Sequence, residues 1–301
     1  MGNFISYKDV PVFANFVSES RDVATSTSAH LFAATQASIN LNPNLTPNRY
    51  LGKVQTKNDF SVTGPLEAKI SITFIPIIET YGQSDLNIQR ENQLAFFNTT
   101  GQFANGHAIQ IGNYFFWRCF LQNYSLKINP FQPVSVTANF IAYDIDNVVN
   151  REFAGLPSTS FSPIQKDVTK PIYKALHGLT TAMIGTSEYL PTTKTNIEVN
   201  VDCGRTPIYS LGNKIPFNVI LTTLERTTTV EGEGIGKAVT LNGSNAGSTN
   251  IYFQPLDNSQ PPTDNAHMLK FDINGRIISQ DLSASQANMV NGRVVIKEIM
   301  L

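Results

Sequence analysis

Runs in which apolar and polar residues alternate dominate the chain. In residues 68–78 (AKISITFIPII), Ile70, Ile72 and Phe74 alternate with serine and threonine. This period of two is typical of a half-buried β-strand, because successive side chains of a strand point to opposite faces. Similar alternation occurs in residues 134–141, 197–201, 216–222, 225–231 and 293–299. The pattern therefore predicts a mainly β fold.

Helical spacing is rare by comparison. The best candidate is residues 163–180, in which Pro171 suits the first turn of a helix and apolar residues follow at helical intervals. A second candidate covers residues 84–97, with Ser84 in position to cap its start. Residues 16–36 hold a third. We therefore expect a short helix beside the strands of each half of the chain.

Turn-forming residues separate the predicted strands. Three Asn-Gly pairs begin at Asn242, Asn274 and Asn291, and Asn-Gly between strands is a strong hairpin signal. Residues 242–266 are rich in asparagine, serine, glycine and proline, and they exceed the length of a simple connection. We interpret this segment as a long loop or a protruding hairpin.

Two octapeptides about half a chain apart echo each other. Residues 46–53 read TPNRYLGK, and residues 206–213 read TPIYSLGN. The flanking blocks match in the same order: SAHL and SINL match SEYL and EVNV upstream, and WRCFLQNYS matches GRIISQDLS downstream. The offsets lie between 158 and 160 positions. Such a long repeat indicates two copies of a whole domain rather than a solenoid, whose units are much shorter.

This internal duplication divides the chain into a first β domain, residues 1–150, and a second, residues 151–301. The natural connection is the segment of about 150–186, which carries the best helix signal. We expect two tandem β-sandwich or rolled β-barrel domains, each with a short flanking helix. Gly52 and Gly212 would then mark equivalent corners, because glycine permits a backbone turn after each Thr-Pro pair.

The composition fits such a fold and argues against several function classes. Only 15% of the 301 residues are charged, against roughly 25% in typical soluble domains, and the net charge is −1. Binders of nucleic acids and anionic membranes carry clustered lysine and arginine, which this sequence lacks. No run approaches the roughly 20 apolar residues of a membrane helix, so we expect no membrane partner. The first residues lack the pattern of a secretory signal, and we expect Cys119 and Cys203 to be free thiols.

No motif predicts catalysis, a metal or a cofactor. Residues 230–237 (VEGEGIGK) resemble a phosphate loop, but Lys237 replaces the glycine of dinucleotide loops and Ala238 the Ser/Thr of triphosphate loops. We interpret this segment as a turn after a strand. Residues 144–147 (DIDN) alternate oxygen ligands as calcium loops do, but lack the glycine and the distal glutamate. The four histidines are scattered. We therefore predict a protein that is not an enzyme.

One pair of strand-like runs resembles a known family. Residues 118–128 (RCFLQNYSLKI), followed by a short turn and residues 134–141 (VSVTANFI), resemble the tail tube proteins of tailed bacteriophages. Those proteins carry a strand with leucine, then serine or asparagine, tyrosine and serine. After a turn, a closing strand has Val-Ser near its start and Phe-Ile or Phe-Val near its end. The resemblance is strongest over about a quarter of the chain.

The second half resembles this family more weakly, from Arg276 to Met300. There Leu282 stands where the first half has Tyr124, and the closing strand carries Lys297 and Glu298. The internal duplication carries the resemblance across the rest of the chain.

The resemblance implies a virion structural protein, a tail tube subunit made in the host cytoplasm and located in the tail. In that family, strands of neighbouring domains join into a closed ring with an inner β-barrel, and DNA passes through the lumen without sequence recognition. Three chains of two domains would make a ring of six domains, a homo-oligomer that stacks into a tube and contacts other tail proteins. Residues 242–266 and 1–30 would contact the next ring.

Within such a ring, the alternating strands are expected to form the sheet between subunits or around the lumen. The residues predicted for this sheet are Ile70, Ile72, Phe74, Val134, Val136, Phe140, Val219, Val230 and Val295. Three alternatives stay open on the sequence. The first is a baseplate, tube-initiating or tail-terminating ring of the same fold. The others are a carbohydrate-binding β-sandwich of a receptor-binding structure, and an enzyme.

Overall fold

The fold is built from β-strands. The computed structural model describes residues 12–15, 29–31, 34–42, 45–47, 60–62, 65, 67–79, 106–112, 114–147, 173–184, 189–234, 236–239, 244–245, 249–255, 269–285 and 288–300. All secondary-structure elements assigned within these ranges are β-strands, which confirms the predicted mainly β fold.

The strands in chain order are β1 (Val12–Asn15), β2 (Ala29–Leu31), β3 (Ala34–Asn42), β4 (Leu45–Pro47), β5 (Phe60–Val62), β6 (Glu67–Phe74), β7 (Ile77–Glu79), β8 (His107–Ile111), β9 (Tyr114–Ile128), β10 (Ser135–Asn147), β11 (Tyr173–Ile184), β12 (Thr193–Ile208), β13 (Asn218–Glu233), β14 (Ser244–Asn245), β15 (Thr249–Pro255), β16 (Leu269–Ile273), β17 (Arg276–Ser285) and β18 (Asn288–Ile299).

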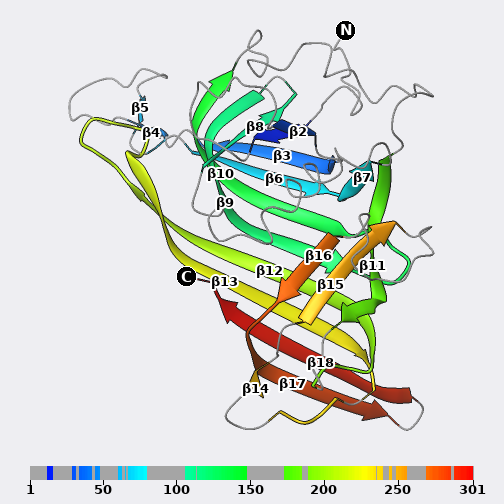
Figure 1. Cartoon of the computed structure of the whole chain (residues 1–301). Helices are drawn as coiled ribbons and strands as arrows, with labels where there is room; N and C mark the ends of the chain where they lie inside the picture. Colours follow the sequence, from blue (N-terminus) through cyan, green and yellow to red (C-terminus); the bar gives the residue numbers. More distant parts are fainter. Residues whose placement is uncertain are drawn as a thin grey trace.

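Most of these strands form one antiparallel sheet, the main sheet (Figure 1). Its continuous path runs β14-β17-β18-β13-β12-β9-β10-β6-β3, and β1, β2 and β8 pair off this path. The pairing of β12 with β9 joins the two halves of the chain, with Ile197 opposite Ile128 and Asp202 opposite Asn123. A four-stranded sheet, β16-β15-β11-β7, and the two-stranded sheet β4-β5 complete the described fold.

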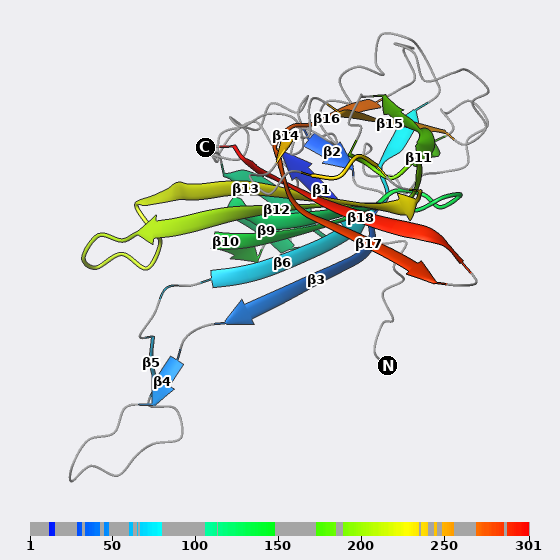
Figure 2. The ribbon, with the colours of Figure 1, turned by 90° about the horizontal axis from the view of Figure 1, so that it is seen from below.

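One face of the main sheet is apolar and closed. Alternate side chains on this face are buried, among them Phe74, Leu126 and Val199. The small sheet packs Phe253 and Ile273 into the same hydrophobic cluster. Figure 2 shows β1, β2, β11, β15 and β16 together on one side of the continuous path of strands. Burial of this face is the main source of stability, because each fully buried aliphatic or aromatic side chain contributes about 1.5–3 kcal/mol.

The opposite face, called the polar face below, carries mostly short polar and charged side chains. In β6, Lys69, Ser71 and Thr73 point to this face, while Ile70 and Ile72 between them are buried in the core. A small apolar cluster interrupts the polar face close to the tip of the β12–β13 hairpin. Its buried members are Phe120, Ile141, Tyr143 and Val219.

The best predicted helix is wrong in the part that the structure describes. Residues 173–184 form strand β11, which pairs first with β7 and then with β15. Neighbouring strands therefore engage this backbone, and tertiary pairing overrides the helical spacing of the side chains. The third candidate is also wrong where it is described, since residues 29–31 and 34–36 lie in strands. Residues 84–97 and 163–172 lie outside the described ranges.

The predicted turns are only partly correct. Asn274 precedes a turn, in which Gly275 has a φ of 134° and the chain crosses from β16 to β17. Gly292, in contrast, lies inside β18, where a Cβ atom would come within 3.3 Å of the Gly234 carbonyl oxygen. Glycine there allows a close backbone approach rather than a hairpin turn. Residues 242–266 contain two strands, β14 and β15, rather than a loop alone.

Candidate functional site

The described residues contain no candidate metal site. No group of three or more His, Cys, Asp or Glu side chains lies close enough to hold a metal ion within the described ranges. None of the described elements is a helix that could cross a bilayer.

The two motifs that resembled ligand loops belong to strands. Residues 230–233 end β13, and Gly234 then turns the chain with a φ of 92°, which confirms a turn after a strand. The Glu231 carboxylate in this motif is bound by Arg293 and does not point into an anion-binding loop. Residues 144–147 are the last four residues of β10.

Both cysteines are free and buried, as the sequence predicts. They lie in the interior of the main sheet, Cys119 in β9 and Cys203 in β12. Burial raises the pKa of the Cys203 thiol to about 12. The thiol therefore stays protonated at neutral pH and is a poor nucleophile.

The nine residues predicted for the assembly sheet lie in or beside the main sheet. Most belong to the apolar face and are buried against the rest of the same chain: Ile70, Ile72, Phe74, Val134, Val136, Phe140 and Val230. Val219 belongs to the small cluster of the polar face, and Val295 lies on that face between strands β13 and β17. A charge at Val136 or Ile72 would therefore disturb folding before it disturbed assembly.

The strand order of the second half repeats that of the first. The strands β12, β13, β17 and β18 take the places of β3, β6, β9 and β10 along the chain. The path of the main sheet reads β17-β18-β13-β12 and continues β9-β10-β6-β3, so one order of four strands occurs twice in the same direction. Each set of four strands is called a four-strand unit below.

The pairing registers extend this match to single residues. Strands β9 and β17 each carry one extra residue against the strand that follows, Gln122 and Ile278. We align the two units so that Gln122 and Ile278 coincide. Following the paired residues from strand to strand within each unit then aligns Asn40 with Asn200. The octapeptides that begin with Thr-Pro have this same offset of 160 positions. Local sequence and long-range pairing therefore agree on the equivalence of β3 and β12.

The downstream block of the echo is displaced by two residues. The sequence match makes Ser283 the counterpart of Ser125. The alignment of the two bulges makes Asp281 the counterpart of Ser125 instead. Both alignments keep every side chain on the same face, because a strand has a period of two. The position of an unpaired bulge residue decides between them, and this position is set by contacts that the sequence does not display.

The two Thr-Pro pairs occupy equivalent hairpins. Pro47 lies in β4 and Pro207 in β12, and each faces the returning strand of a hairpin that extends from the main sheet (Figure 1). Gly212 has a φ of 83° at the tip of the second hairpin, as expected for a turn glycine. Gly52 lies outside the described residues.

The strands near the two ends of the sheet path, β3 and β17, are the counterparts of the two strands that pair where the units join. Inside the chain, β12 of the second unit pairs with β9 of the first. At one end, β3 is the counterpart of β12, and it pairs only with β6 among the described strands. At the other end, β17 is the counterpart of β9, and β14 covers it only at Arg276 and Ile277. Residues 279–285 of β17 therefore have an edge that no other described strand covers.

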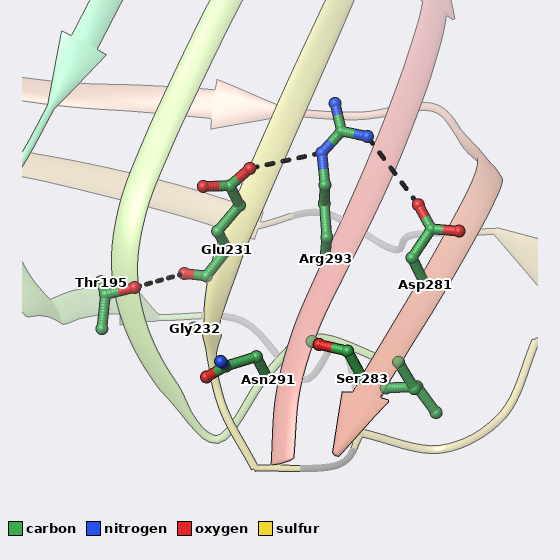
Figure 3. Close-up of a pocket in the computed structure, with 9 residues that line it drawn as sticks. Thr195, Glu231, Gly232, Asp281, Ser283, Asn291 and Arg293 are labelled. Atoms are coloured by element: carbon green, nitrogen blue, oxygen red, sulfur yellow. Dashed lines mark hydrogen bonds and ion pairs between the residues drawn. The ribbon is translucent and has the colours of Figure 1, made fainter. Parts of the chain in front are cut away.

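Charged side chains form a ladder across the polar face of the second unit (Figure 3). The Arg293 guanidinium of β18 lies between the Glu231 carboxylate of β13, at 3.3 Å, and the Asp281 carboxylate of β17, at 3.8 Å. On the same strands, the Lys297 ammonium lies 2.8 Å from the Glu225 carboxylate. Opposite charges on neighbouring strands thus neutralise one another along this face.

The hollow beside this ladder does not make a ligand site. It measures about 450 Å³ and is lined by residues of β12, β13, β17 and β18, including Thr195, Asp281 and Asn291. That size would admit a small molecule, but ligand pockets are mostly apolar with few polar groups. Here the charged groups of the lining, Glu231, Arg293 and Asp281, are paired with each other.

Two residues that the sequence marked as a departure from the family receive a structural explanation. Lys297 points to the polar face, where it pairs with Glu225. Glu298 points to the other side and pairs with Arg226, whose side chain is only 5% exposed. Burial raises the pKa of the nearby Tyr124 phenol well above its usual range, although Arg226 lowers it in part. Tyr124 therefore stays neutral at neutral pH.

Replacing Glu298 by glutamine is expected to destabilise the chain by about 3–5 kcal/mol, because the mostly buried Arg226 guanidinium would lose its counter-charge. Glu225→Gln is the matched control. Its pair with Lys297 has both side chains more than a third exposed, so its loss is expected to cost at most about 1 kcal/mol. Urea unfolding of both variants measures the difference. Equal losses for the two variants would contradict the structural role of the buried pair.

The tip of the β12–β13 hairpin exposes a group of large apolar side chains. Leu211 is 104% exposed and Phe217 is 77% exposed, and Tyr209 beside them is also exposed. The base of the tip is fixed, because Arg118 donates a hydrogen bond of 2.7 Å to the carbonyl of Pro216. This exposed group was not predicted from the sequence, because an alternating run bounded by glycine does not reveal which apolar side chains stay exposed to solvent.

Comparisons with known proteins add no family assignment. No protein-family model matches the chain, and no curated protein sequence gives a significant match.

Proposed function

We propose that this protein is a virion structural protein, a subunit of a bacteriophage-type tail tube that forms stacked rings around a channel for DNA. The observation that carries the proposal is the repeated four-strand unit, whose open edges are the counterparts of the two strands that join inside the chain. A closed ring needs such a contact between two different surfaces of one subunit, repeated around an axis. The sequence resemblance to tail tube proteins supports the same reading.

In this proposal the chain is a fusion of two quasi-equivalent β-sandwich or rolled-barrel domains. The internal junction between β12 and β9 then serves as one contact of the ring, and the contact between chains repeats it. Three chains would supply six units, a trimer with pseudo-sixfold symmetry. The chemistry of the open edge agrees with a pairing role, because β3 (ATQASINLN) carries no charged residue. Charges and prolines on edge strands are the usual protection against such pairing.

The polar face is our choice for the wall of the channel. The apolar face is covered by other strands of the same chain, whereas the polar face is lined by serine, threonine, asparagine and paired charges. Thr73 and Thr137 share a hydrogen bond of 3.0 Å there, and Asn139 donates one of 2.6 Å to Asn123. Three basic groups of this face, Lys127, Arg293 and Lys297, have carboxylate partners, which makes them poor binding sites for phosphates. DNA would pass without being held.

Stacking of rings would use the hairpin tips. The exposed side chains of Leu211 and Phe217 project from the end of the main sheet and have no cover in the described part of the chain. Apolar groups at a protruding tip are typical of a contact with another protein surface. Residues 242–266, which the sequence also suggested for this role, contain β14 and β15, and the remainder lies outside the described residues.

The proposal includes neither catalysis nor a cofactor, and it places the mature protein in the tail of a virion after synthesis in the host cytoplasm. Its partners are other copies of this chain and other tail proteins. Negative-stain electron microscopy of the purified chain tests it. We expect tubes or rings with a central hole. A chain that stays a 33.1 kDa monomer at high concentration would overturn the proposal.

A further inference from the structure

The geometry points to a specific strand pairing between chains, which rests on the proposed ring. We infer that β3 of one copy pairs antiparallel with residues 279–284 of β17 in a second copy. In this pairing Ile39 lies opposite Leu282 and Asn40 lies opposite Asp281. The partner surface is thus the far edge of an identical main sheet.

The register follows from the junction inside the chain. There Val199 of β12 lies opposite Leu126 of β9, and Asn200 lies opposite Ser125. Superposition of the bulges at Gln122 and Ile278 makes Leu282 the counterpart of Leu126, and it makes Asp281 the counterpart of Ser125.

The strand pairings within each four-strand unit give the corresponding residues of β3 and β12. They make Ile39 the counterpart of Val199 and Asn40 the counterpart of Asn200. Strand β14 covers β17 only at Arg276 and Ile277, so the residues used by the transferred register lie beyond that contact.

The burial of the corresponding side chains supports the same contact. Inside the chain, Leu126 is 0% and Val201 is 1% exposed. Their counterparts at the open edges, Leu282 and Leu41, are 48% and 49% exposed. Large apolar side chains at both edges therefore lack the cover that their counterparts have, and a second copy placed as at the junction would supply it.

The polar side of the proposed contact is chemically compatible. The Asn40 amide can donate a hydrogen bond to the Asp281 carboxylate, which already faces Arg293. Ser38 and Ser283 would replace the pair that Glu198 and Lys127 form at the internal junction. The contact between chains would therefore contain fewer charges than the contact inside the chain, and it would depend less on ionic strength.

The sequence match predicts a different register for the pairing of β3 with β17. The aligned letters of the sequence echo would place Leu41, rather than Ile39, opposite Leu282. The two registers differ by a shift of two residues and keep every side chain on its face. Directly opposite residues in an antiparallel pair have Cα atoms about 4.5–5.5 Å apart, whereas a disulfide cannot form beyond about 7 Å. Disulfide cross-linking therefore separates the two.

The experiment uses full-length chains with two added cysteines, oxidised after assembly and analysed on non-reducing gels. One variant carries Ile39→Cys with Leu282→Cys, and the other carries Leu41→Cys with Leu282→Cys. The two positions lie at opposite ends of the sheet path, so a bond between them must join two chains. We expect covalent multimers from the first variant at a rate at least ten times that of the second. Asn40→Cys with Asp281→Cys tests the adjacent residue pair of the same register, on the polar face, if the first variant does not assemble.

The outcomes separate the inference from the function on which it rests. Assembled rings that cross-link through Leu41→Cys and Leu282→Cys, or through neither pair, would overturn the pairing and leave the ring in place. Wild-type chains that form no rings would overturn the proposed function, and the pairing would fall with it. Wild-type chains show the background from Cys119 and Cys203, which are buried.

Discussion

Replacing Leu282 by glutamate is expected to keep the chain monomeric under conditions in which the wild type assembles. Leu282 is 48% exposed at the edge of β17, so the folded chain tolerates a charge there. In the proposed ring the side chain is covered by a second copy, and an unpaired carboxylate would be buried in every contact between chains. A cost of roughly 3 kcal/mol weakens each contact by about a hundredfold. Sedimentation velocity across a concentration series measures this change.

Two variants make that result interpretable. Phe131→Glu is the matched control, because Phe131 is 86% exposed in the turn between β9 and β10, which are interior strands of the sheet path. It should assemble as the wild type does. The double variant Ile39→Lys with Leu282→Glu should recover part of the assembly, because the two new charges would meet across the contact. Normal assembly of Leu282→Glu alone would contradict an edge-to-edge ring.

Replacing Leu211 and Phe217 together by aspartate is expected to leave rings intact and to abolish their stacking into tubes. Both side chains lie at the tip of the β12–β13 hairpin, away from the edges that close the ring. Two buried carboxylates at each stacking contact would cost roughly 4 kcal/mol or more, enough to reduce tube length to single rings at micromolar concentration. Electron microscopy of the assembled material measures the length distribution.

The control for this variant adds charge without removing an apolar group. Thr222→Asp lies on β13 below the tip, at an exposed position. It is expected to give tubes of normal length. Tubes of normal length from the Leu211→Asp and Phe217→Asp variant would show that the tip is not a stacking contact. Loss of the rings themselves would show that the tip belongs to ring closure.

The sequence predicted strands well because their signal is local. Alternation in residues 68–78, 134–141 and 293–299 is a property of neighbouring positions, and those runs lie in β6, β10 and β18, with β7 taking the end of the first. The helix expected at 163–180 failed in its second part for the opposite reason. Residues 173–184 have apolar groups at helical intervals, but β7 and β15 pair with that backbone, and a distant partner leaves no mark on local spacing.

The candidate assembly site was only half visible in the sequence. The match between Asn40 and Asn200 predicted an internal repeat, and in the structure the strand order β17-β18-β13-β12 is followed by β9-β10-β6-β3. Which strands lie at the ends of the sheet could not be read, because strand order depends on contacts between residues far apart in the chain. The predicted residues Ile72 and Val136 are strand residues but face the core. The alternation identified the strands, but it did not identify which edge or face is open to another chain.

A reconstruction of the assembled protein by cryo-electron microscopy would show whether the edges of β3 and β17 join neighbouring chains. We expect a continuous belt of strands around the channel, in which one four-strand unit recurs six times and three of the six junctions lie inside a chain. The polar face, with the Glu231–Arg293–Asp281 ladder, should line the channel. A ring whose chains touch through the small sheet β16-β15-β11-β7, with the edges of β3 and β17 apart, would contradict it.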